Sequence, residues 1–330
     1  MRLFTENLSP TGQLTCYLQD RSDELSNARV RPAVLVLPGG GYSFCSDREA
    51  EPVALAYLAE GFNAFVLRYA AGPDAPWTQS FADGQAGLAW IRQHAGELDV
   101  DPARIAAVGF SAGGHLAASL GVAGDDRPDA LVLGYPVTLA EFGPPIGKEI
   151  LDVVDAVNDQ TPPTFLFSTY PDSLVPIRNS LELLSALAAH DVPFESHIYL
   201  LGAHGLSLAK PLTANGGSWG VDPVVAQWLP DSVRFLQRVL RDFPVEGAPS
   251  TFADLEQRKR FGLGMQVRRL LADERAVAII DDHLPGVTRL LRQDQLVEGF
   301  PLREALGFSP QPIDPEVLAR LGERLAALND

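Results

Sequence analysis

The chain has 330 residues, of which 46% are hydrophobic and 21% are charged, so it can bury a sizeable core. Its formal net charge of −16 repels phosphate backbones and anionic headgroups, which excludes nucleic acid and membrane as expected partners. No apolar stretch approaches the length of a membrane span, and the first twenty residues lack the apolar run of a signal peptide, so we expect a cytoplasmic location.

Alternating strands and helices are predicted over the first 242 residues, after an N-terminal segment of thirty residues that is expected to be antiparallel. Short apolar runs predict strands at 33–37, 62–67, 104–108, 130–134 and 163–168, and a strand with a more polar alternate face is predicted at 194–200. Helices are predicted between the strands at 48–60, 79–95, 113–121 and 176–190, and after the last strand at about 223–241. This alternation predicts an α/β fold, a mostly parallel sheet with helices on both faces. Its chemistry is expected at the carboxyl ends of the strands.

The composition changes after residue 242. The segment 242–252 is rich in Pro, Gly and small residues, which is typical of a linker, and only helices are predicted beyond it. Residues 1–250 carry 29 acidic and 15 basic side chains, whereas 251–330 carry 13 and 11. We therefore expect a catalytic domain at 1–246, and at 247–330 a linker with a small all-helical domain. Two roles stay open for its apolar stripes: association into a homo-oligomer, or docking to a partner.

Ser111 lies within the sequence Gly-Phe-Ser-Ala-Gly, between a predicted strand and a predicted helix. A serine on such a sharp turn is held in a strained backbone conformation, so that its hydroxyl projects above the sheet. The alternative is a Gly/Ser turn that serves packing alone. The strand-to-helix context favours a nucleophile.

A serine hydroxyl is a weak nucleophile that needs a base, and the base needs an acid to orient it. Asp172 follows the predicted strand 163–168, and His204 follows the strand 194–200 between two glycines. The order serine, acid, histidine along the chain is the one that this architecture uses. Other histidines are weaker candidates for the base because they lie in or near predicted helices, inside a strand, or in the C-terminal helical region: His94, His115, His190, His197 and His283. Other aspartates are weaker candidates for the acid because none directly follows an apolar strand: Asp152, Asp155 and Asp159.

A tetrahedral intermediate also needs amide donors aimed at its oxyanion. The loop Pro38-Gly39-Gly40-Gly41 follows the first core strand and can present bare N–H groups. We expect one donor from Ala112 and another from Gly40 or Gly41. A phosphate-binding loop is disfavoured because no Lys-Ser/Thr pair follows the glycines. The scattered histidines form no ligand pair at metal spacing, so neither a metal nor a cofactor is expected.

Several motifs together resemble a known family. They are Pro-Gly-Gly-Gly-Tyr, Arg48-Glu49 with Glu51-Pro52, Leu67-Arg68-Tyr69, Gly-Phe-Ser-Ala-Gly-Gly-His, Gly134-Tyr135-Pro136, Asp172 with Val175-Pro176, and Ala203-His204-Gly205. Over residues 12–242 the chain resembles the α/β-hydrolase superfamily, in the branch of acetyl xylan esterases and related carbohydrate esterases, near the hormone-sensitive-lipase-like esterases. One departure is Pro38, where many of these esterases have histidine; proline cannot donate an N–H there.

The resemblance implies hydrolysis of small carboxylic esters, in particular acetyl groups on sugars or xylo-oligosaccharides. Tyr42, Tyr135 and Trp219 are candidate walls for the alcohol part, because sugar rings stack on aromatic side chains; core or lid packing is the alternative for each. Other readings stay open at this point. An arylformamidase or a peptidase would use the same triad, and a non-catalytic binding protein could be built on the same fold.

Overall fold

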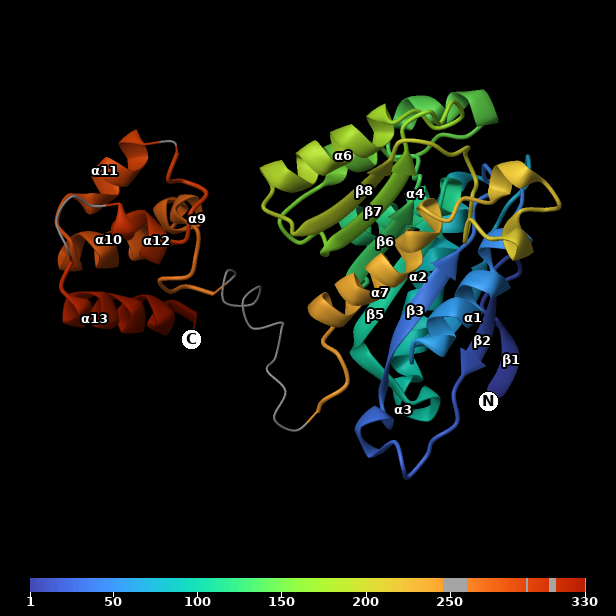
Figure 1. Ribbon diagram of the computed structural model, residues 1–330, viewed down its shortest axis with the longest axis horizontal. Helices are drawn as coiled ribbons and strands as arrows, with labels where there is room; N and C mark the ends of the chain where they lie inside the picture. Colours follow the sequence, from blue (N-terminus) through green and yellow to red (C-terminus); the bar gives the residue numbers. More distant parts are fainter. Residues whose placement is uncertain (246–259, 295, 309–312, 330) are drawn as a thin grey trace. The chain divides into compact units, whose positions relative to one another are not determined.

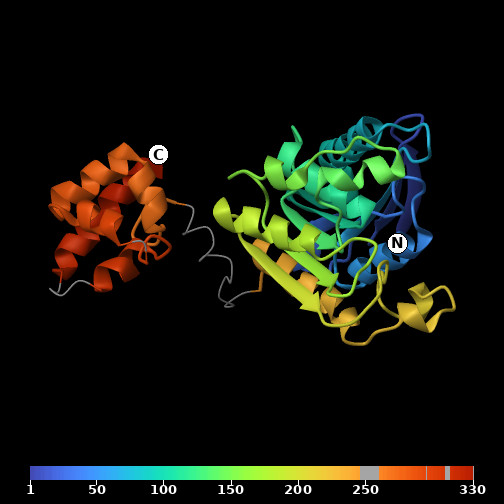
Figure 2. The ribbon, with the colours of Figure 1, turned by 90° about the horizontal axis from the view of Figure 1, so that it is seen from above.

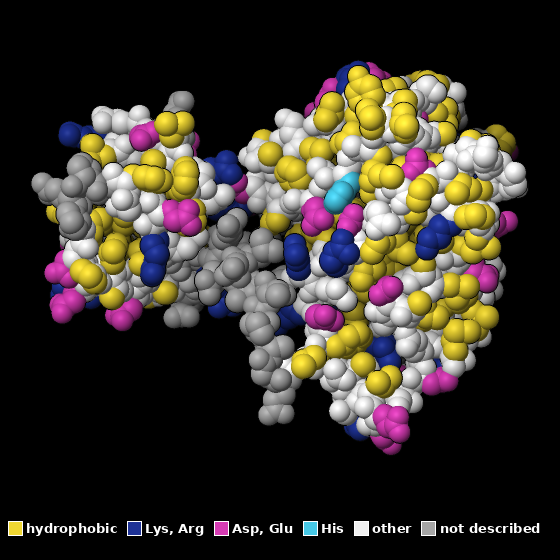
Figure 3. Space-filling view, viewed as in Figure 1, with side chains coloured by type: hydrophobic (Ala, Val, Ile, Leu, Met, Phe, Trp, Pro, Cys, Tyr) yellow, Lys and Arg dark blue, Asp and Glu magenta, His cyan; other side chains and the backbone are white. Residues whose placement is uncertain are grey.

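The computed structural model describes residues 1–245, 260–294, 296–308 and 313–329. The chain divides into two compact units, Met1–Ala248 and Pro249–Asp330. The boundary expected at 246/247, and most of the expected linker, lie outside the described residues. On the face shown in Figure 3, acidic and basic side chains of the first unit are interspersed, so the net charge is not gathered into one acidic patch on that face.

The first unit is built on one eight-stranded sheet with the order β1-β2-β4-β3-β5-β6-β7-β8. The strands β1 and β2 pair antiparallel with each other, β2 pairs antiparallel with β4, and all later pairs are parallel. This agrees with the expected antiparallel N-terminus and parallel core. The strands are β1 Arg2–Asn7, β2 Gln13–Leu18, β3 Arg31–Leu37, β4 Asn63–Arg68, β5 Val100–Phe110, β6 Ala130–Gly134, β7 Thr164–Thr169 and β8 Phe194–Tyr199.

Helices cover both faces of this sheet (Figures 1 and 2). Helices α1 and α7 lie on one face, and α2, α4 and α6 lie on the other. The crossovers between parallel strands place them there. The helices of this unit are α1 Glu51–Ala59, α2 Trp77–Gln93, α3 Ala95–Leu98, α4 Ala112–Ala123, α5 Val153–Ala156, α6 Arg178–Ala189 and α7 Trp228–Val239.

The two faces of the sheet bury different side chains. Along β7, Phe165 and Phe167 point to the α7 face, where Phe167 stacks on Trp228 at 4.6 Å between ring centroids. Leu166 between them belongs to the aliphatic core on the opposite face. Because alternate residues of a strand point to opposite faces, a central parallel strand is apolar throughout. The strands that precede Ser111 and Asp172 are thus buried over most of their length, whereas β8, before His204, is partly exposed.

The second unit, within its described residues, consists of short helices around a small apolar core. The helices are α9 Val267–Ala272, α10 Glu274–His283, α11 Val287–Gln293, α12 Leu302–Gly307 and α13 Pro315–Ala326. Val267, Leu270, Ile280 and Leu321 are fully buried within that core. Asp273 and Asp314 cap α10 and α13 by accepting backbone N–H groups.

In the described part of the chain, no helix combines the length and apolar character that crossing a bilayer requires.

Candidate active site

Ser111 occupies the sharp turn between β5 and α4, with φ 52° and ψ −119°. Non-glycine residues rarely adopt positive φ, so this conformation stores strain. The neighbouring glycines make the turn sterically possible: a β-carbon at Gly109 would lie 2.1 Å from the carbonyl oxygen of Gly113, and one at Gly113 would lie 2.1 Å from that of Leu37. The Ser111 amide donates to the carbonyl of Gly134 at 2.9 Å, which ties the turn to β6.

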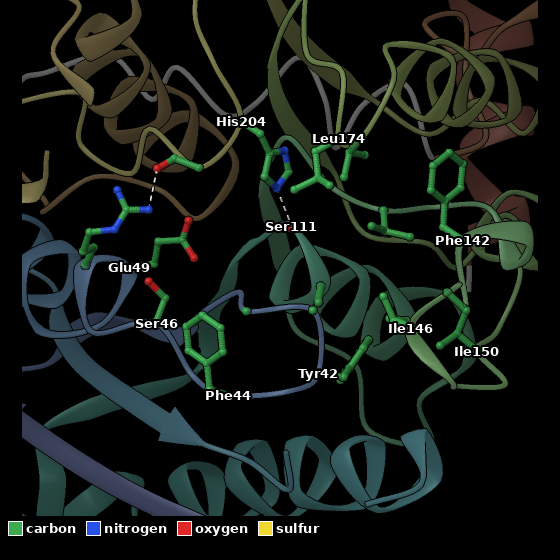
Figure 4. Close-up of a pocket in the computed structure, with 17 residues that line it drawn as sticks. Tyr42, Phe44, Ser46, Glu49, Ser111, Phe142, Ile146, Ile150, Leu174 and His204 are labelled. Atoms are coloured by element: carbon green, nitrogen blue, oxygen red, sulfur yellow. Dashed lines mark hydrogen bonds between the residues drawn. The ribbon is translucent and has the colours of Figure 1, made fainter. Parts of the chain in front are cut away.

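Ser111, His204 and Asp172 form one hydrogen-bonded row (Figure 4 shows Ser111 and His204). The Nε2 atom of His204 lies 2.8 Å from the Oγ atom of Ser111, and its Nδ1 atom lies 2.6 Å from the Oδ2 atom of Asp172. The Asp172 side chain is buried, and its Oδ1 atom accepts the N–H groups of Leu174 and Val175 at 2.9 Å each. A carboxylate that orients an imidazole toward a serine is the arrangement that makes the hydroxyl nucleophilic.

The glycine loop after β3 lies beside this row. Gly40 has φ +130°, and a β-carbon there would lie 2.1 Å from the carbonyl oxygen of Phe44, so only glycine fits. Within the described chain, the amides of Gly40, Gly41 and Ala112 donate no hydrogen bond, and all three residues line the cavity at Ser111. Free amides beside a nucleophile are the donors that an oxyanion requires.

A cavity of about 330 Å³ opens at Ser111. Figure 4 shows Phe142, Ile146 and Ile150 on one side of Ser111, and Phe44, Ser46 and Glu49 on the other. Small-molecule sites occupy about 300–1,000 Å³, so this cavity suits a small ligand. One side of Ser111 is thus apolar, and the other carries hydroxyl and carboxylate groups.

Phe142, Ile146 and Ile150 come from one continuous segment, residues 142–150, which we call the wall segment. The buried side chain of Lys148 holds it in place: its ammonium donates to the carbonyls of Gly72 at 2.6 Å and Pro73 at 3.2 Å, and to that of Ala75. Backbone carbonyls can satisfy a buried ammonium, which carries three donors. The wall segment is therefore attached to the loop that follows β4.

The three aromatic residues expected to contact substrate differ in position. Tyr42 lines the cavity, although it is only 1% exposed. Tyr135 is not among the cavity-lining residues: it is buried, and its ring meets the His204 ring edge-on at 5.0 Å between centroids. The structure therefore assigns Tyr135 a packing position. Trp219 is half-exposed and also lies outside the lining, with its ring 5.2 Å from the Arg48 guanidinium.

His115, four residues after Ser111, is fully buried and bonded at both ring nitrogens. Its Nε2 atom lies 2.8 Å from the carbonyl oxygen of Leu151, so that nitrogen donates; its Nδ1 atom then accepts from the Tyr42 hydroxyl at 2.7 Å. Burial lowers the pKa of His115 to about 4. This histidine is a neutral structural link between Tyr42 and Leu151, two residues that are distant from it in the sequence.

Two cavity residues had no assigned role in the sequence analysis. Glu49 is buried, with an Oε2 atom that accepts from the Gly39 amide at 2.8 Å and an Oε1 atom that accepts from the Tyr135 hydroxyl at 2.6 Å. The Arg48 guanidinium donates to the carbonyl of Gly205, next to His204, at 2.8 Å. The signal in the sequence was the Arg48-Glu49 pair among the motifs that carry the family resemblance, to which no role was assigned.

Among the residues with described positions, no group of three or more His, Cys, Asp or Glu side chains could hold a metal ion.

Comparison with known proteins gives concordant results. The BD-FAE family matches residues 23–135. The endo-1,4-beta-xylanase B of Butyrivibrio fibrisolvens is 33% identical over 220 residues, which are 58% of this chain and 35% of that protein. The acetylxylan esterase of Xylanibacter ruminicola is 30% identical over 229 residues, which are 61% of this chain and 45% of that protein. The chain thus spans less than half the length of these two curated relatives.

A solved structure matches over nearly its whole length. MGS-M1, an alpha/beta hydrolase enzyme from a Medee basin deep-sea metagenome library, is 41% identical with a TM-score of 0.69, and the match covers 73% of this chain and 98% of that one. The chain belongs to the α/β-hydrolase superfamily, in its acetyl xylan esterase and carbohydrate esterase-like branch.

Proposed function

We propose that the chain is a serine hydrolase that cleaves small carboxylic esters through an acyl-enzyme on Ser111. The observation that carries this proposal is the continuous row Ser111–His204–Asp172, at 2.8 and 2.6 Å, which opens into a cavity beside free backbone amides. Nucleophile, base, orienting acid and oxyanion donors are thus all within reach of one reacting carbon.

In the first step His204 Nε2 takes the proton of the Ser111 hydroxyl as the Oγ atom bonds to the ester carbonyl carbon. The carbonyl oxygen becomes an oxyanion, which the amides of Ala112 and Gly40 or Gly41 stabilise. The imidazolium, paired with Asp172, then gives its proton to the leaving alcohol oxygen as the C–O bond breaks. Water repeats the sequence on the acyl-enzyme, releasing the carboxylic acid and restoring Ser111.

The substrate class that we propose is acetyl esters of sugars or xylo-oligosaccharides. One support is the relationship to an acetylxylan esterase and to a xylanase. Another is the cavity, whose size suits a small ligand and whose polar side carries Ser46, Arg48 and Glu49. Trp219 lies on Arg48, so a sugar that extends past Arg48 would meet an exposed aromatic face. We retain Trp219 as a proposed alcohol contact.

The experiment is a substrate profile of the purified chain with product measured directly. Acetylated xylo-oligosaccharides, p-nitrophenyl acetate, longer p-nitrophenyl esters, formylkynurenine and peptide anilides are compared by kcat/KM, and acetate release is quantified. We expect the highest values for acetyl esters. Preference for formylkynurenine or an anilide would replace the ester assignment with an amide one, and no turnover of any of them would favour a binding protein.

The matched variants are Ser111→Ala and Ser185→Ala, the latter an exposed serine on α6. We expect Ser111→Ala to lower turnover of p-nitrophenyl acetate by about 10⁴-fold or more, because no other group can carry the acyl chain. Ser185→Ala should match the parent chain. Parent-like turnover by a pure Ser111→Ala preparation would contradict the proposed nucleophile.

A further inference from the structure

Glu49 is a buried carboxylate that the proposed reaction does not use. It is 3% exposed, it ends the short helix η2 Asp47–Glu49, and it lines the cavity at Ser111. Acidic side chains are almost never buried without partners. Here each carboxylate oxygen has one: Oε2 accepts from the Gly39 amide, and Oε1 accepts from the Tyr135 hydroxyl.

These two bonds lead to opposite sides of the site. Gly39 is the residue before Gly40 and Gly41, the expected oxyanion donors, and a β-carbon on Gly39 would lie only 2.7 Å from Oε2 of Glu49. The Tyr135 hydroxyl accepts from the Ser207 amide at 2.9 Å, in the loop that carries His204. A single carboxylate therefore joins the oxyanion loop to the histidine loop.

The linked residues are held in strained conformations. Tyr135 has φ 37° and Ser207 has φ 51°, both in the region that favours glycine. Such conformations cost about 1–3 kcal/mol each and persist only where surrounding contacts fix them. Arg48 is the residue before Glu49, and its carbonyl accepts a hydrogen bond from the Ser207 hydroxyl at 2.5 Å. Both loops are thus anchored on the Arg48–Glu49 dipeptide.

We propose that Glu49 is a positioning residue, whose carboxylate fixes the oxyanion loop and the His204 loop relative to Ser111. The inference rests on the proposed esterase function. Both partners of Glu49 donate, so the position requires an acceptor at each oxygen. Glutamine has one acceptor, and its NH₂ group would face either the Gly39 N–H or the Tyr135 O–H. The substitution therefore removes the acceptor for one of the two donors while it keeps the side-chain volume.

The first test compares Glu49→Gln with Glu51→Gln, the same change two residues away at an exposed position outside the cavity. For Glu49→Gln we expect kcat on p-nitrophenyl acetate to fall by about 10- to 100-fold, because displaced oxyanion donors stabilise the transition state less well. KM should stay within threefold of the parent value. Glu51→Gln should match the parent chain. A kcat within threefold for Glu49→Gln, or a change confined to KM, would overturn the proposal.

A second variant, Tyr135→Phe, keeps the ring against His204 and removes the hydroxyl between Glu49 and Ser207. We expect it to lower kcat in the same direction, and the double variant to lose little beyond Glu49→Gln alone, since the three groups form one chain. Losses that multiply would mean that Glu49 does not act through Tyr135, and the link to the histidine loop would be rejected. This variant also serves if Glu49→Gln does not fold.

The third readout does not depend on ester turnover. A fluorophosphonate probe forms a tetrahedral adduct on an activated serine, so its second-order labelling rate reports the positioning of Ser111, His204 and the oxyanion amides. We expect about a tenfold slower rate for Glu49→Gln and no change for Glu51→Gln. A parent chain that labels but hydrolyses no ester would refute the proposed function, whereas equal labelling of both variants would refute the role of Glu49.

Discussion

The two units of this chain differ in where backbone strain lies. All nine non-glycine residues with positive φ in the described chain belong to the first unit, and Tyr42, Ser111, Tyr135 and Ser207 among them lie in or around the site. In the described part of the second unit, only Gly286 has positive φ. Strain persists only where neighbouring contacts enforce it, and it gathers where function requires it. The comparison identifies the first unit as the chemical one and the second as a conventional helical assembly.

The largest effect is expected at the base and its acid. His204→Ala should lower kcat/KM on p-nitrophenyl acetate about as far as Ser111→Ala does, and Asp172→Asn somewhat less, because the imidazole then loses its orientation. The double variant should lose little beyond His204→Ala, since the residues act as one unit. Steady-state kinetics of the four proteins gives the answer. If the double variant lost activity by the product of the two single-variant factors, His204 and Asp172 would not act as one unit.

The serine turn should tolerate no added atom, in contrast to helical glycines elsewhere. Gly113→Ala places a methyl group 2.1 Å from the carbonyl oxygen of Leu37. We expect a destabilisation of about 3 kcal/mol or more, or a shifted Ser111 with turnover at least 100-fold lower. Gly96→Ala in α3 and Gly307→Ala in α12 are the controls, because a β-carbon there meets nothing within 4 Å. Equal behaviour of all three variants in thermal melts and kinetics would undermine the role of the turn.

The second unit should be separable from the chemistry. Leu270→Ala removes a fully buried side chain from its core, which should lower the free energy of unfolding of that unit by about 2–5 kcal/mol. Calorimetry should show the change in one transition only, and turnover of p-nitrophenyl acetate should stay within twofold. If Leu270→Ala abolished turnover while the unfolding transition of the first unit stayed unchanged, the second unit would contribute to the site.

A chain that ends at residue 246 tests whether the second unit associates the protein into a homo-oligomer, one of the two roles expected for it. It should retain small-ester turnover and differ from the full chain in molar mass by light scattering, or in activity on bulky substrates. If the shortened and full chains had the same molar mass and the same activity on small and on bulky substrates, the association role of the second unit would be rejected.

The smallest effect concerns pH. The pKa of His115 is lowered from 6.5 to about 4 by burial, so the folded protein keeps this side chain neutral while the unfolded chain protonates it. Its contribution to the free energy of unfolding is therefore complete above pH 6.5 and is lost as the pH falls toward 4, by about 3 kcal/mol. In urea titrations at pH 7 and 4.5, His115→Gln should lose less stability than the parent chain. An equal loss would contradict a buried neutral His115.

The sequence predicted most of the scaffold because buried parallel strands are apolar throughout. The strand expected at 130–134 coincides with β6, and the other core strands agree within a few residues, except β5, which extends to Val100–Phe110. The serine turn and Asp172 were recognisable because each follows an apolar run, and His204 because it follows a predicted strand and lies between two glycines. Both expectations depend on local patterns along the chain.

The remainder depended on contacts between distant segments. Glu49 and Tyr135 are 86 residues apart, and no local pattern indicates that their side chains meet. Tyr135 was a candidate substrate contact because sugar rings stack on aromatic side chains, yet it is buried and its hydroxyl is bonded on both sides within the protein, in line with the packing alternative. Short loop helices such as η2 also gave no periodic signal, since three residues are too few for one.

The wall segment has a consequence for redesigning specificity. Residues 142–150 carry Phe142, Ile146 and Ile150, contain no member of the proposed triad, and are anchored by Lys148 on carbonyl groups alone. Backbone carbonyls are present whatever the side chains nearby, so the anchor survives exchange of its surroundings. The three apolar side chains of the wall segment can therefore be varied in a library that tests acyl-chain preference, while the proposed nucleophile and base are left unchanged.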